Sequence, residues 1–245
     1  MRKRKHNAIG WCHETRNPIT GCDKWCSYCY VARDDQPKMK FFWPKGYKPT
    51  EAEKEARRQE IMKPTFHPDQ LAKMKKELAT TEPSRVFVGS CADMFGNWIK
   101  PGADVSPVHV LQVLEVCAGL PQHRFLFLTK NPVGYAQYEF PENCWCGTSV
   151  TGERKTNDRI KVLMDSVPER RFVSIEPFVG GVLPVDAFHA DWIIVGGLTG
   201  KNPQKPNDSL MWAVVELSKE WGKPVFIKDN AGNGPQQLPE GLGVD

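Results

Sequence analysis

The sequence predicts an α/β fold in which a parallel sheet forms the core of one domain over residues 1–245. Two observations support this prediction. From residue 84 onward, short apolar runs rich in β-branched residues alternate with segments of helical periodicity. A chain of 245 residues is also long enough to bury one sizeable core without a second domain. We therefore expect repeated βα units whose strands lie side by side.

Six strands are predicted, each as a short apolar run. They cover residues 85–88, 124–128, 144–146, 171–175, 192–195 and 224–227. Helices with a 3.6-residue period are predicted over residues 108–118, 156–164 and 208–221. Asp208 is expected to cap the last helix and Gly222 to end it. This alternation fits a complete or partial barrel and equally an open doubly wound sheet.

Three segments do not follow the alternation. Residues 13–34 form a cysteine-rich loop, and residues 35–62 are charged and aromatic, so we expect an insertion or lid there. Residues 231–245 lack periodicity and are expected to wrap the surface or to fray. The core of the sheet is then expected within residues 84–230.

Composition argues against a membrane or exported protein. Hydrophobic residues make up 40% and charged residues 25% of the chain, and no apolar stretch is long enough to span a bilayer. The basic start is followed by too short an apolar segment for a signal peptide. We expect a cytoplasmic protein whose eight cysteines stay reduced, so that clustered cysteines bind metal or perform redox chemistry.

Polar residues follow several predicted strands directly. They are Ser90, Cys91 and Asp93, then Thr129 and Lys130, then Ser149, Glu176, Gly196, Gly197, Lys228 and Asp229. The carboxyl ends of parallel strands meet at one edge, which carries the active site in such folds. We therefore expect these residues to share a polar cavity.

Cys22, Cys26 and Cys29 place three thiols within eight residues, close enough to aim at one metal centre. A 4Fe-4S cluster needs four ligands, so three protein thiolates leave one iron open to a small molecule. The alternative is a structural zinc site completed by Cys12 or His13.

The spacing Cys22-x3-Cys26-x-Tyr28-Cys29 resembles the signature of radical S-adenosylmethionine enzymes, which have an aromatic residue just before the third cysteine. The resemblance extends to a phage-associated radical-SAM-like family often encoded near three-Cys-motif partner proteins. Its matching segments are residues 15–22, 86–95, 128–130, 158–160, 172–177, 191–197 and 226–228. The resemblance implies a partial parallel (βα)6-type barrel with a 4Fe-4S cluster on the three cysteines and S-adenosyl-L-methionine at the open iron.

The resemblance also implies roles for residues that bind the cofactor. Tyr28 is expected near the adenine, and Ser90 and Asp93 near the amino group, although Asp93 is also a candidate helix cap. Ser149 is expected among the cofactor-binding residues. Apart from the resemblance, Gly196 and Gly197 are expected to let the backbone approach a ligand closely or to form a simple tight turn.

Four residues are candidates for catalysis. Lys130 and Glu176, at the ends of strands taken to be neighbours, are expected to form a buried pair, to contact the cofactor's carboxylate and ribose, or to touch substrate. Cys91 is a candidate hydrogen-atom donor or a small buried side chain. Lys228 is expected either to face substrate or to form a surface pair with Asp229.

The activity implied by the resemblance is reductive cleavage of S-adenosylmethionine to a 5′-deoxyadenosyl radical, which abstracts hydrogen from substrate. An external electron donor and a partner protein are expected partners, and a phage-encoded chain would act in the host cytoplasm. The phage association and the formal charge of +4 favour a DNA or nucleotide substrate, such as a modified thymidine whose side chain is rearranged. Candidate phosphate and base contacts are Arg16, Arg33, Phe41, Phe42, Trp43 and Tyr47. The alternatives are a lyase resembling spore photoproduct lyase and a zinc-stapled, non-enzymatic binding module.

Overall fold

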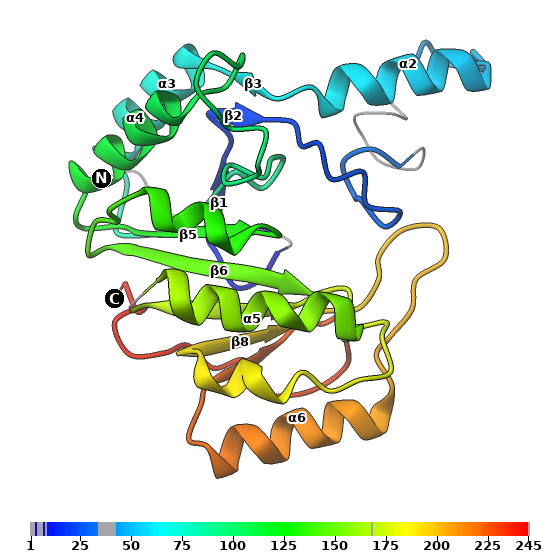
Figure 1. The fold of residues 1–245 in the computed structure, drawn as a ribbon, viewed down its shortest axis with the longest axis vertical. Coiled ribbons are helices and arrows are strands. Elements are labelled where there is room, and N and C mark those ends of the chain that lie inside the picture. The colour runs from blue at the N-terminus through cyan, green and yellow to red at the C-terminus, as the bar shows by residue number, and fades with distance from the viewer. Residues whose placement is uncertain (1–2, 4–6, 8, 34–42, 168, 245) are drawn as a thin grey trace.

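The computed structural model describes residues 3, 7, 9–33, 43–167 and 169–244. Its centre is a seven-stranded parallel sheet with the order β1-β4-β5-β6-β7-β8-β9, curled into a half-barrel (Figure 1). The spatial order of the strands never reverses along the chain, as it would in a doubly wound sheet. The fold is therefore of the partial-barrel type, and the open doubly wound alternative is wrong.

The strands of the half-barrel are β1 (Glu14–Arg16), β4 (Arg85–Val88), β5 (Arg124–Thr129), β6 (Cys144–Val150), β7 (Arg171–Ile175), β8 (Trp192–Val195) and β9 (Val225–Ile227). The α-helices are α2 (Glu51–Met62), α3 (Pro68–Leu78), α4 (Pro107–Ala118), α5 (Arg154–Ser166) and α6 (Asp208–Glu220). Two 3-10 helices are η1 (Pro132–Gln137) and η2 (Val185–His189). The short strands β2 (Ile19–Thr20) and β3 (Thr65–Phe66) form a separate antiparallel pair.

All six predicted strands and all three predicted helices are present, with shifts at some ends. Asn207 rather than Asp208 caps α6, because its side-chain oxygen accepts the N–H groups of Ser209 and Leu210 at 2.9 and 3.4 Å. Gly222 follows this helix with a φ of 61°, as expected for a residue that ends it. The sheet also begins earlier than residue 84, because β1 pairs with β4 at its edge.

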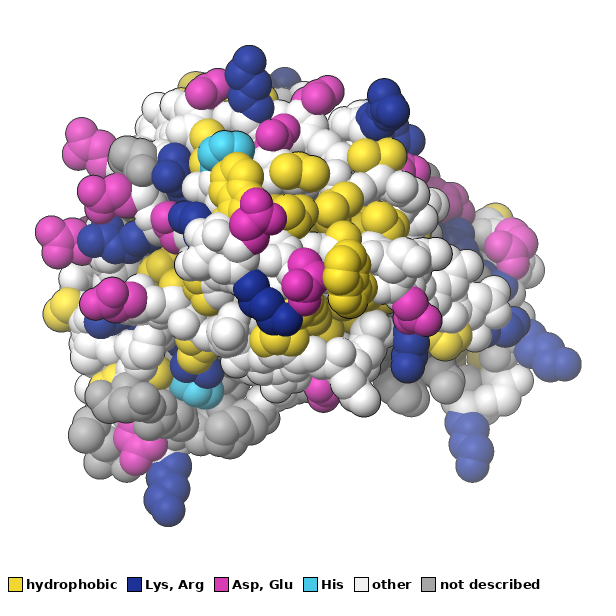
Figure 2. All heavy atoms as spheres, turned by 90° about the horizontal axis from the view of Figure 1, so that it is seen from below, with side chains coloured by type: hydrophobic (Ala, Val, Ile, Leu, Met, Phe, Trp, Pro, Cys, Tyr) yellow, Lys and Arg dark blue, Asp and Glu magenta, His cyan; other side chains and the backbone are white. Residues whose placement is uncertain are grey.

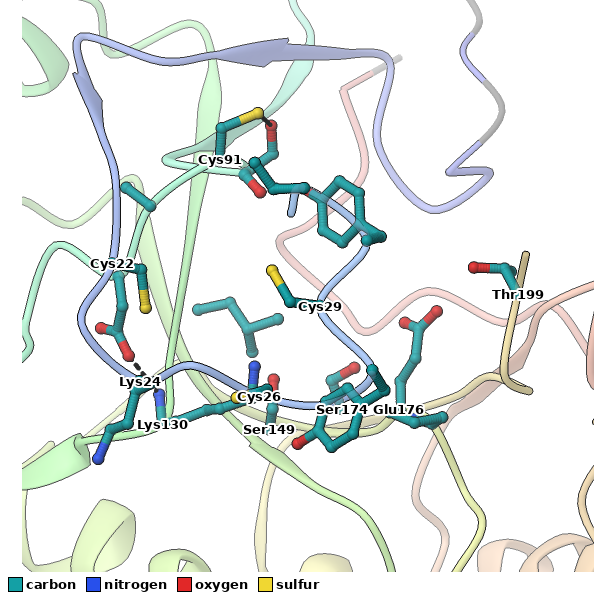
Figure 3. A pocket seen from close by; sticks show the side chains of 18 of the residues that line it. Cys22, Lys24, Cys26, Cys29, Cys91, Lys130, Ser149, Ser174, Glu176 and Thr199 are labelled. Carbon is teal, nitrogen blue, oxygen red and sulfur yellow. Dashed lines mark hydrogen bonds between the residues drawn. The ribbon is translucent and has the colours of Figure 1, made fainter. Parts of the chain in front are cut away.

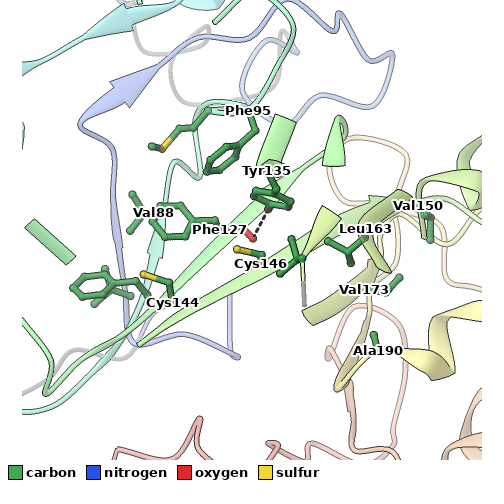
Figure 4. Packing of buried hydrophobic residues seen from close by; sticks show 14 of the residues in the cluster. Val88, Phe95, Phe127, Tyr135, Cys144, Cys146, Val150, Leu163, Val173 and Ala190 are labelled. Carbon is green, nitrogen blue, oxygen red and sulfur yellow. Dashed lines mark hydrogen bonds between the residues drawn. The ribbon is translucent and has the colours of Figure 1, made fainter. Parts of the chain in front are cut away.

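The outer face of the sheet packs against α4, α5 and α6. Figure 4 shows part of this layer, in which Val173 of β7 lies near Leu163 of α5, and Phe127 of β5 lies near Tyr135 of η1. Cys144 and Cys146 both belong to this outer layer, because residues two apart on a strand share a face. These two cysteines are therefore core residues.

The inner face of the half-barrel encloses a second buried cluster. It consists of Trp11, Cys12, Phe87, Leu126, Trp145, Phe172, Trp192, Ile194, Phe226 and Leu242. Trp11 comes from before β1, and Leu242, which is fully buried, comes from after β9. The segment after residue 230 was expected to wrap the surface, but part of it fills the interior because its apolar side chains close the open centre.

The segment predicted as a lid contains α2, while its residues 35–42 lie outside the described part of the chain. The Thr50 side chain caps α2 by accepting the Glu53 N–H, and the Glu53 carboxylate accepts the Thr50 backbone N–H at 2.8 Å. The helix projects away from the half-barrel in Figure 1, and its buried residues are Ile61 and Met62 at its carboxyl end. That end lies against the site described below.

Figure 2 shows the molecule from below, where hydrophobic side chains gather among charged ones. Large hydrophobic residues exposed on η2 and around α6 include Val185, Trp212 and Trp221. Within the described residues, no helix combines the length and apolar character needed to cross a membrane.

Candidate functional site

A cavity of about 430 Å³ lies inside the half-barrel at the carboxyl ends of the strands. Trp11, Phe87 and Leu128 provide apolar lining, and the cysteine loop covers one side. Every residue predicted as a catalytic, cofactor or metal residue lines this cavity except Gly196. The volume is in the range of small-molecule sites.

The cysteine loop is anchored by backbone contacts at its start. Gly21 donates its N–H to Cys91 O at 2.9 Å, and Cys22 donates its N–H to Met62 O at 2.8 Å. Gly21 has a φ of 86°, and a Cβ there would lie 2.2 Å from Lys63 O, so only glycine fits. This close approach ties the loop to the end of α2.

Cys22, Cys26 and Cys29 are free, partly buried thiols spread along the loop as it curves around the cavity (Figure 3). In the described part of the chain, no three His, Cys, Asp or Glu side chains are close enough together to hold a metal ion. Burial, followed by the nearby Asp93 carboxylate, raises the pKa of Cys22 to about 12, so this thiol must lose a proton to become a ligand. The donor set is three soft sulfur atoms facing one cavity, which suits an iron–sulfur cluster.

The zinc alternative required Cys12 or His13 as the fourth ligand. The Cys12 sulfur instead accepts a hydrogen bond from Asn7 Nδ2 at 3.3 Å inside the half-barrel. His13 Nδ1 accepts the N–H of Arg85 at 2.9 Å, at the start of β4 and therefore away from the strand ends that carry the loop. Neither residue is placed to complete a zinc site with the three loop cysteines.

Lys130 follows β5 and lies beneath the loop, with its Nζ 5.4 Å from the centroid of the Tyr28 ring. Burial alone lowers the pKa of its ammonium, but the acidic groups around it, Cys26 foremost, outweigh burial and raise that pKa. The predicted pair with Glu176 does not form, because β6 separates β5 from β7. Lys130 instead provides the positive charge next to the thiols.

Glu176 pairs with Lys228, with Oε1 2.5 Å from Nζ. A Cβ on Gly196 would lie 2.6 Å from Glu176 Cδ, so the glycine accommodates the glutamate side chain and does not line the cavity. Asp229 does not pair with Lys228, because it accepts a hydrogen bond from Gln236 Nε2 at 3.0 Å. The ion pair thus faces the cavity while Asp229 points elsewhere.

Ser90 and Cys91 follow β4 and are held by Asn17, a residue that sequence reasoning did not single out. Asn17 Oδ1 accepts hydrogen bonds from Ser90 Oγ at 3.1 Å and from the Cys91 N–H at 2.8 Å. The Cys91 sulfur lies 3.9 Å from Ser90 Oγ and lines the cavity. Cys91 is therefore a partly buried thiol within the site.

Asp93 accepts three hydrogen bonds within the protein. Its donors are Thr129 Oγ1 at 2.5 Å, the Lys130 N–H at 2.9 Å and the Phe95 N–H at 3.3 Å. The bonds from Thr129 and Lys130 join the loop after β4 to the end of β5, and no helix begins at Asp93. The helix-cap alternative for Asp93 is wrong, and its carboxylate fixes the position of Lys130.

Ser149 and Ser174 place hydroxyl groups on the cavity wall from β6 and β7. Ser174 was not predicted. The residue is 1% exposed, and its Oγ has no hydrogen-bond partner in the structure. The two-residue period leading up to Glu176 would have pointed to Ser174, because both residues face inward.

The residues expected to contact nucleic acid are mostly engaged within the protein. Arg16 lies 2.5 Å from Glu14 and 2.6 Å from Glu77, and the Trp43 and Tyr47 rings stack on each other. Phe41 and Phe42 lie outside the described residues. Arg33 comes at the end of the cysteine loop, and its backbone N–H donates to Cys29 O at 3.2 Å. Trp25 was not predicted, yet it lies at the cavity with a φ of 48° and 46% exposure.

Comparison with protein-family models gives a match over residues 6–239 to the family described as "Protein of unknown function (DUF5131)". No curated protein and no solved structure matches the chain.

Proposed function

Because the chain belongs to the DUF5131 family, whose function is unknown, its activity must be inferred from the site, and we propose a radical S-adenosylmethionine enzyme. The observation that carries the proposal is that Cys22, Cys26 and Cys29, in the signature spacing, line one cavity at the carboxyl ends of a half-barrel. When bound, the 4Fe-4S cluster and S-adenosylmethionine supply one-electron cleavage to methionine and a 5′-deoxyadenosyl radical, with the electron coming from an external donor.

The residues around the loop support this chemistry through charge. Thiolate ligands place negative charge at the cavity, and Lys130 lies close enough to these sulfurs for them to raise its pKa. Asp93 holds the Lys130 backbone in place through the N–H bond at 2.9 Å. Lys130 therefore offsets ligand charge, and the Tyr28 ring beside it offers a face for the cofactor's adenine.

The cavity also protects a reactive intermediate from water. Trp11, Phe87 and Leu128 form an apolar part of its wall. Excluding water from such a wall suppresses side reactions of a radical. Cys91, which lines the cavity after β4, is the candidate hydrogen-atom donor to a substrate radical.

For the substrate we favour a modified base of DNA, with rearrangement of its side chain as the reaction. Trp25 offers an exposed indole next to Lys24, and both line the cavity. An exposed indole stacks on bases, and a cation beside it attracts phosphate. A base extracted from the duplex would enter past these two residues.

The test is anaerobic reconstitution with iron and sulfide, comparing the wild type with Cys26→Ala and with the control Cys117→Ala. Cys117 is fully buried in the outer core, away from the cavity lining, so its variant controls for loss of a thiol. We expect wild type and Cys117→Ala to bind iron and to form 5′-deoxyadenosine with dithionite, whereas Cys26→Ala does neither. Wild-type protein that holds no iron after reconstitution, or that binds iron equally well without Cys26, would contradict the proposal.

A further inference from the structure

One wall of the cavity carries three polar groups whose hydrogen-bonding capacity the protein itself leaves partly unused. Ser174 and Glu176 lie two residues apart on β7 and its extension, and both line the cavity. The Glu176 N–H donates to Val150 O at 2.9 Å, so the parallel ladder continues and the two side chains face the same way. Lys228 joins them through its bond to Glu176 Oε1.

Each of these groups has a free position. Glu176 Oε1 is occupied by Lys228, and among the described residues Oε2 has no hydrogen-bond partner. The Lys228 ammonium has three N–H donors and uses one on Glu176. Ser174 Oγ is buried without any partner, which costs free energy unless a ligand completes it. Figure 3 shows Ser174 and Glu176 side by side on the cavity wall.

We infer that Lys228, Glu176 and Ser174 recognise the lactam edge of a heterocyclic base, that is, a ring N–H beside a carbonyl group, as in thymine and uracil. Glu176 Oε2 accepts the ring N–H, and Lys228 donates to the neighbouring carbonyl oxygen. Ser174 donates to a second carbonyl on the other side of the N–H. This inference rests on the proposed function and names the class of base that it acts on.

The pattern excludes cytosine and adenine. Both present a ring nitrogen that accepts hydrogen bonds, flanked by an amino group that donates them. Against this wall, the ring nitrogen would meet the Glu176 carboxylate whichever way round the base lies. Two acceptors would then face each other, leaving buried groups unpaired. The ion pair is neutral overall, so a neutral base edge also leaves no uncompensated charge.

The experiment measures binding of thymidine, uridine and cytidine to the full chain without a cluster, by calorimetry. We expect thymidine and uridine to bind at least about tenfold more tightly than cytidine. In Glu176→Gln, Lys228 still holds the side-chain oxygen, so the amide NH2 takes the place of Oε2 and presents a donor. The preference should then move toward cytidine. Equal binding of the three nucleosides by wild type, no detectable binding, or an unchanged preference in Glu176→Gln overturns the inference.

Ser174→Ala tests the third group. Because its hydroxyl has no partner within the protein, the variant should keep or raise its thermal midpoint yet bind thymidine about fivefold more weakly. The matched control is Ser218→Ala, which removes a hydroxyl that donates to Lys223 O at 2.6 Å outside the cavity. It should lower the midpoint and leave thymidine binding unchanged, and the reverse pattern overturns the role of Ser174.

The two proposals fail separately. Nucleoside binding is measured without iron, and 5′-deoxyadenosine formation is measured without a nucleoside. Iron binding without nucleoside preference overturns only the base recognition. Nucleoside preference without an iron-binding cysteine loop overturns only the radical chemistry.

Discussion

Glu176 reaches Lys228 across the end of β8, with its Oε1 2.5 Å from the ammonium nitrogen. The Glu176 side chain passes over Gly196, and a Cβ on Gly196 would lie 2.6 Å from Glu176 Cδ. The ion pair therefore depends on the absence of a side chain at residue 196. It connects the ends of β7 and β9, which are not neighbours in the sheet.

Gly196→Ala is expected to break this relationship. The added methyl group must displace the Glu176 side chain or the backbone of β8, which costs about 1–3 kcal/mol of unfolding free energy. Urea unfolding measures the loss. Gly181→Ala is the control, because nothing lies within 4 Å of a Cβ there, and its effect should stay within about 0.5 kcal/mol. Similar stabilities of the two variants would contradict the prediction.

Ser174→Ala is expected to leave the unfolding free energy unchanged or to raise it. Its buried Oγ makes no hydrogen bond, so the variant removes a desolvated polar group and breaks no hydrogen bond. Ser218→Ala should lose about 0.5–1.5 kcal/mol, because it removes the bond to Lys223 O. Thermal or urea unfolding of both variants tests this prediction. A loss of unfolding free energy in Ser174→Ala as large as that in Ser218→Ala would refute the prediction.

Asp93→Asn is expected to destabilise the protein by about 1.5–3 kcal/mol. The carboxylate accepts hydrogen bonds from Thr129, Lys130 and Phe95, and an amide NH2 would turn one acceptor into a donor facing another donor. Asp229→Asn is the control, because its bond to Gln236 is exposed and an amide oxygen can replace it. If urea unfolding gives equal losses for the two variants, the three-bond account of Asp93 is wrong.

Alkaline pH is expected to destabilise the protein partly through Cys12. Burial raises the pKa of its thiol from 9.0 to about 11, so between these values the unfolded chain loses a proton that the folded chain keeps. The unfolded state then binds fewer protons, and stability falls as pH rises through this window. The contribution of Cys12 should reach about 3 kcal/mol above the window.

Comparison of wild type with Cys12→Ala isolates this contribution. The unfolding free energy of the variant should fall less steeply between pH 9 and 11 than that of wild type, because other groups still titrate. Parallel curves for the two proteins would mean that Cys12 ionises equally in both states.

The strands could be predicted from the sequence where an apolar run reflects burial within the sheet. Residues 85–88, 171–175 and 192–195 were predicted with the bounds of β4, β7 and β8, because runs buried on both faces are continuously apolar. The edge strand β1 was missed, since Glu14, Thr15 and Arg16 are polar and only three residues pair. The helix α2 was missed despite its capping box at Thr50 and Glu53, because the charged run after it lacks an apolar stripe.

The residues of the site were predictable by position, whereas their partners were not. Polar residues after apolar strands collect at one edge in any parallel sheet, which explains why nearly all of them line the cavity. Which of these side chains pair with one another depends on the order of the strands in the sheet. Because that order was not known from the sequence, Lys130 was wrongly paired with Glu176. Ser174 lies within β7 and does not follow it. It can be recognised as a site residue only when the face of β7 that points into the half-barrel is known.

The interior of the half-barrel joins Trp11, which precedes all seven strands, to the same buried cluster as Leu242, which follows them. On the ribosome, the place that Leu242 fills in the inner cluster stays empty until residue 242 has left the exit tunnel. Trp145, Phe172 and Trp192 therefore lack part of their packing while the chain is incomplete, and transiently exposed apolar surface of this kind is what chaperones bind. The inner cluster is therefore completed only after the last strand of the sheet has been made.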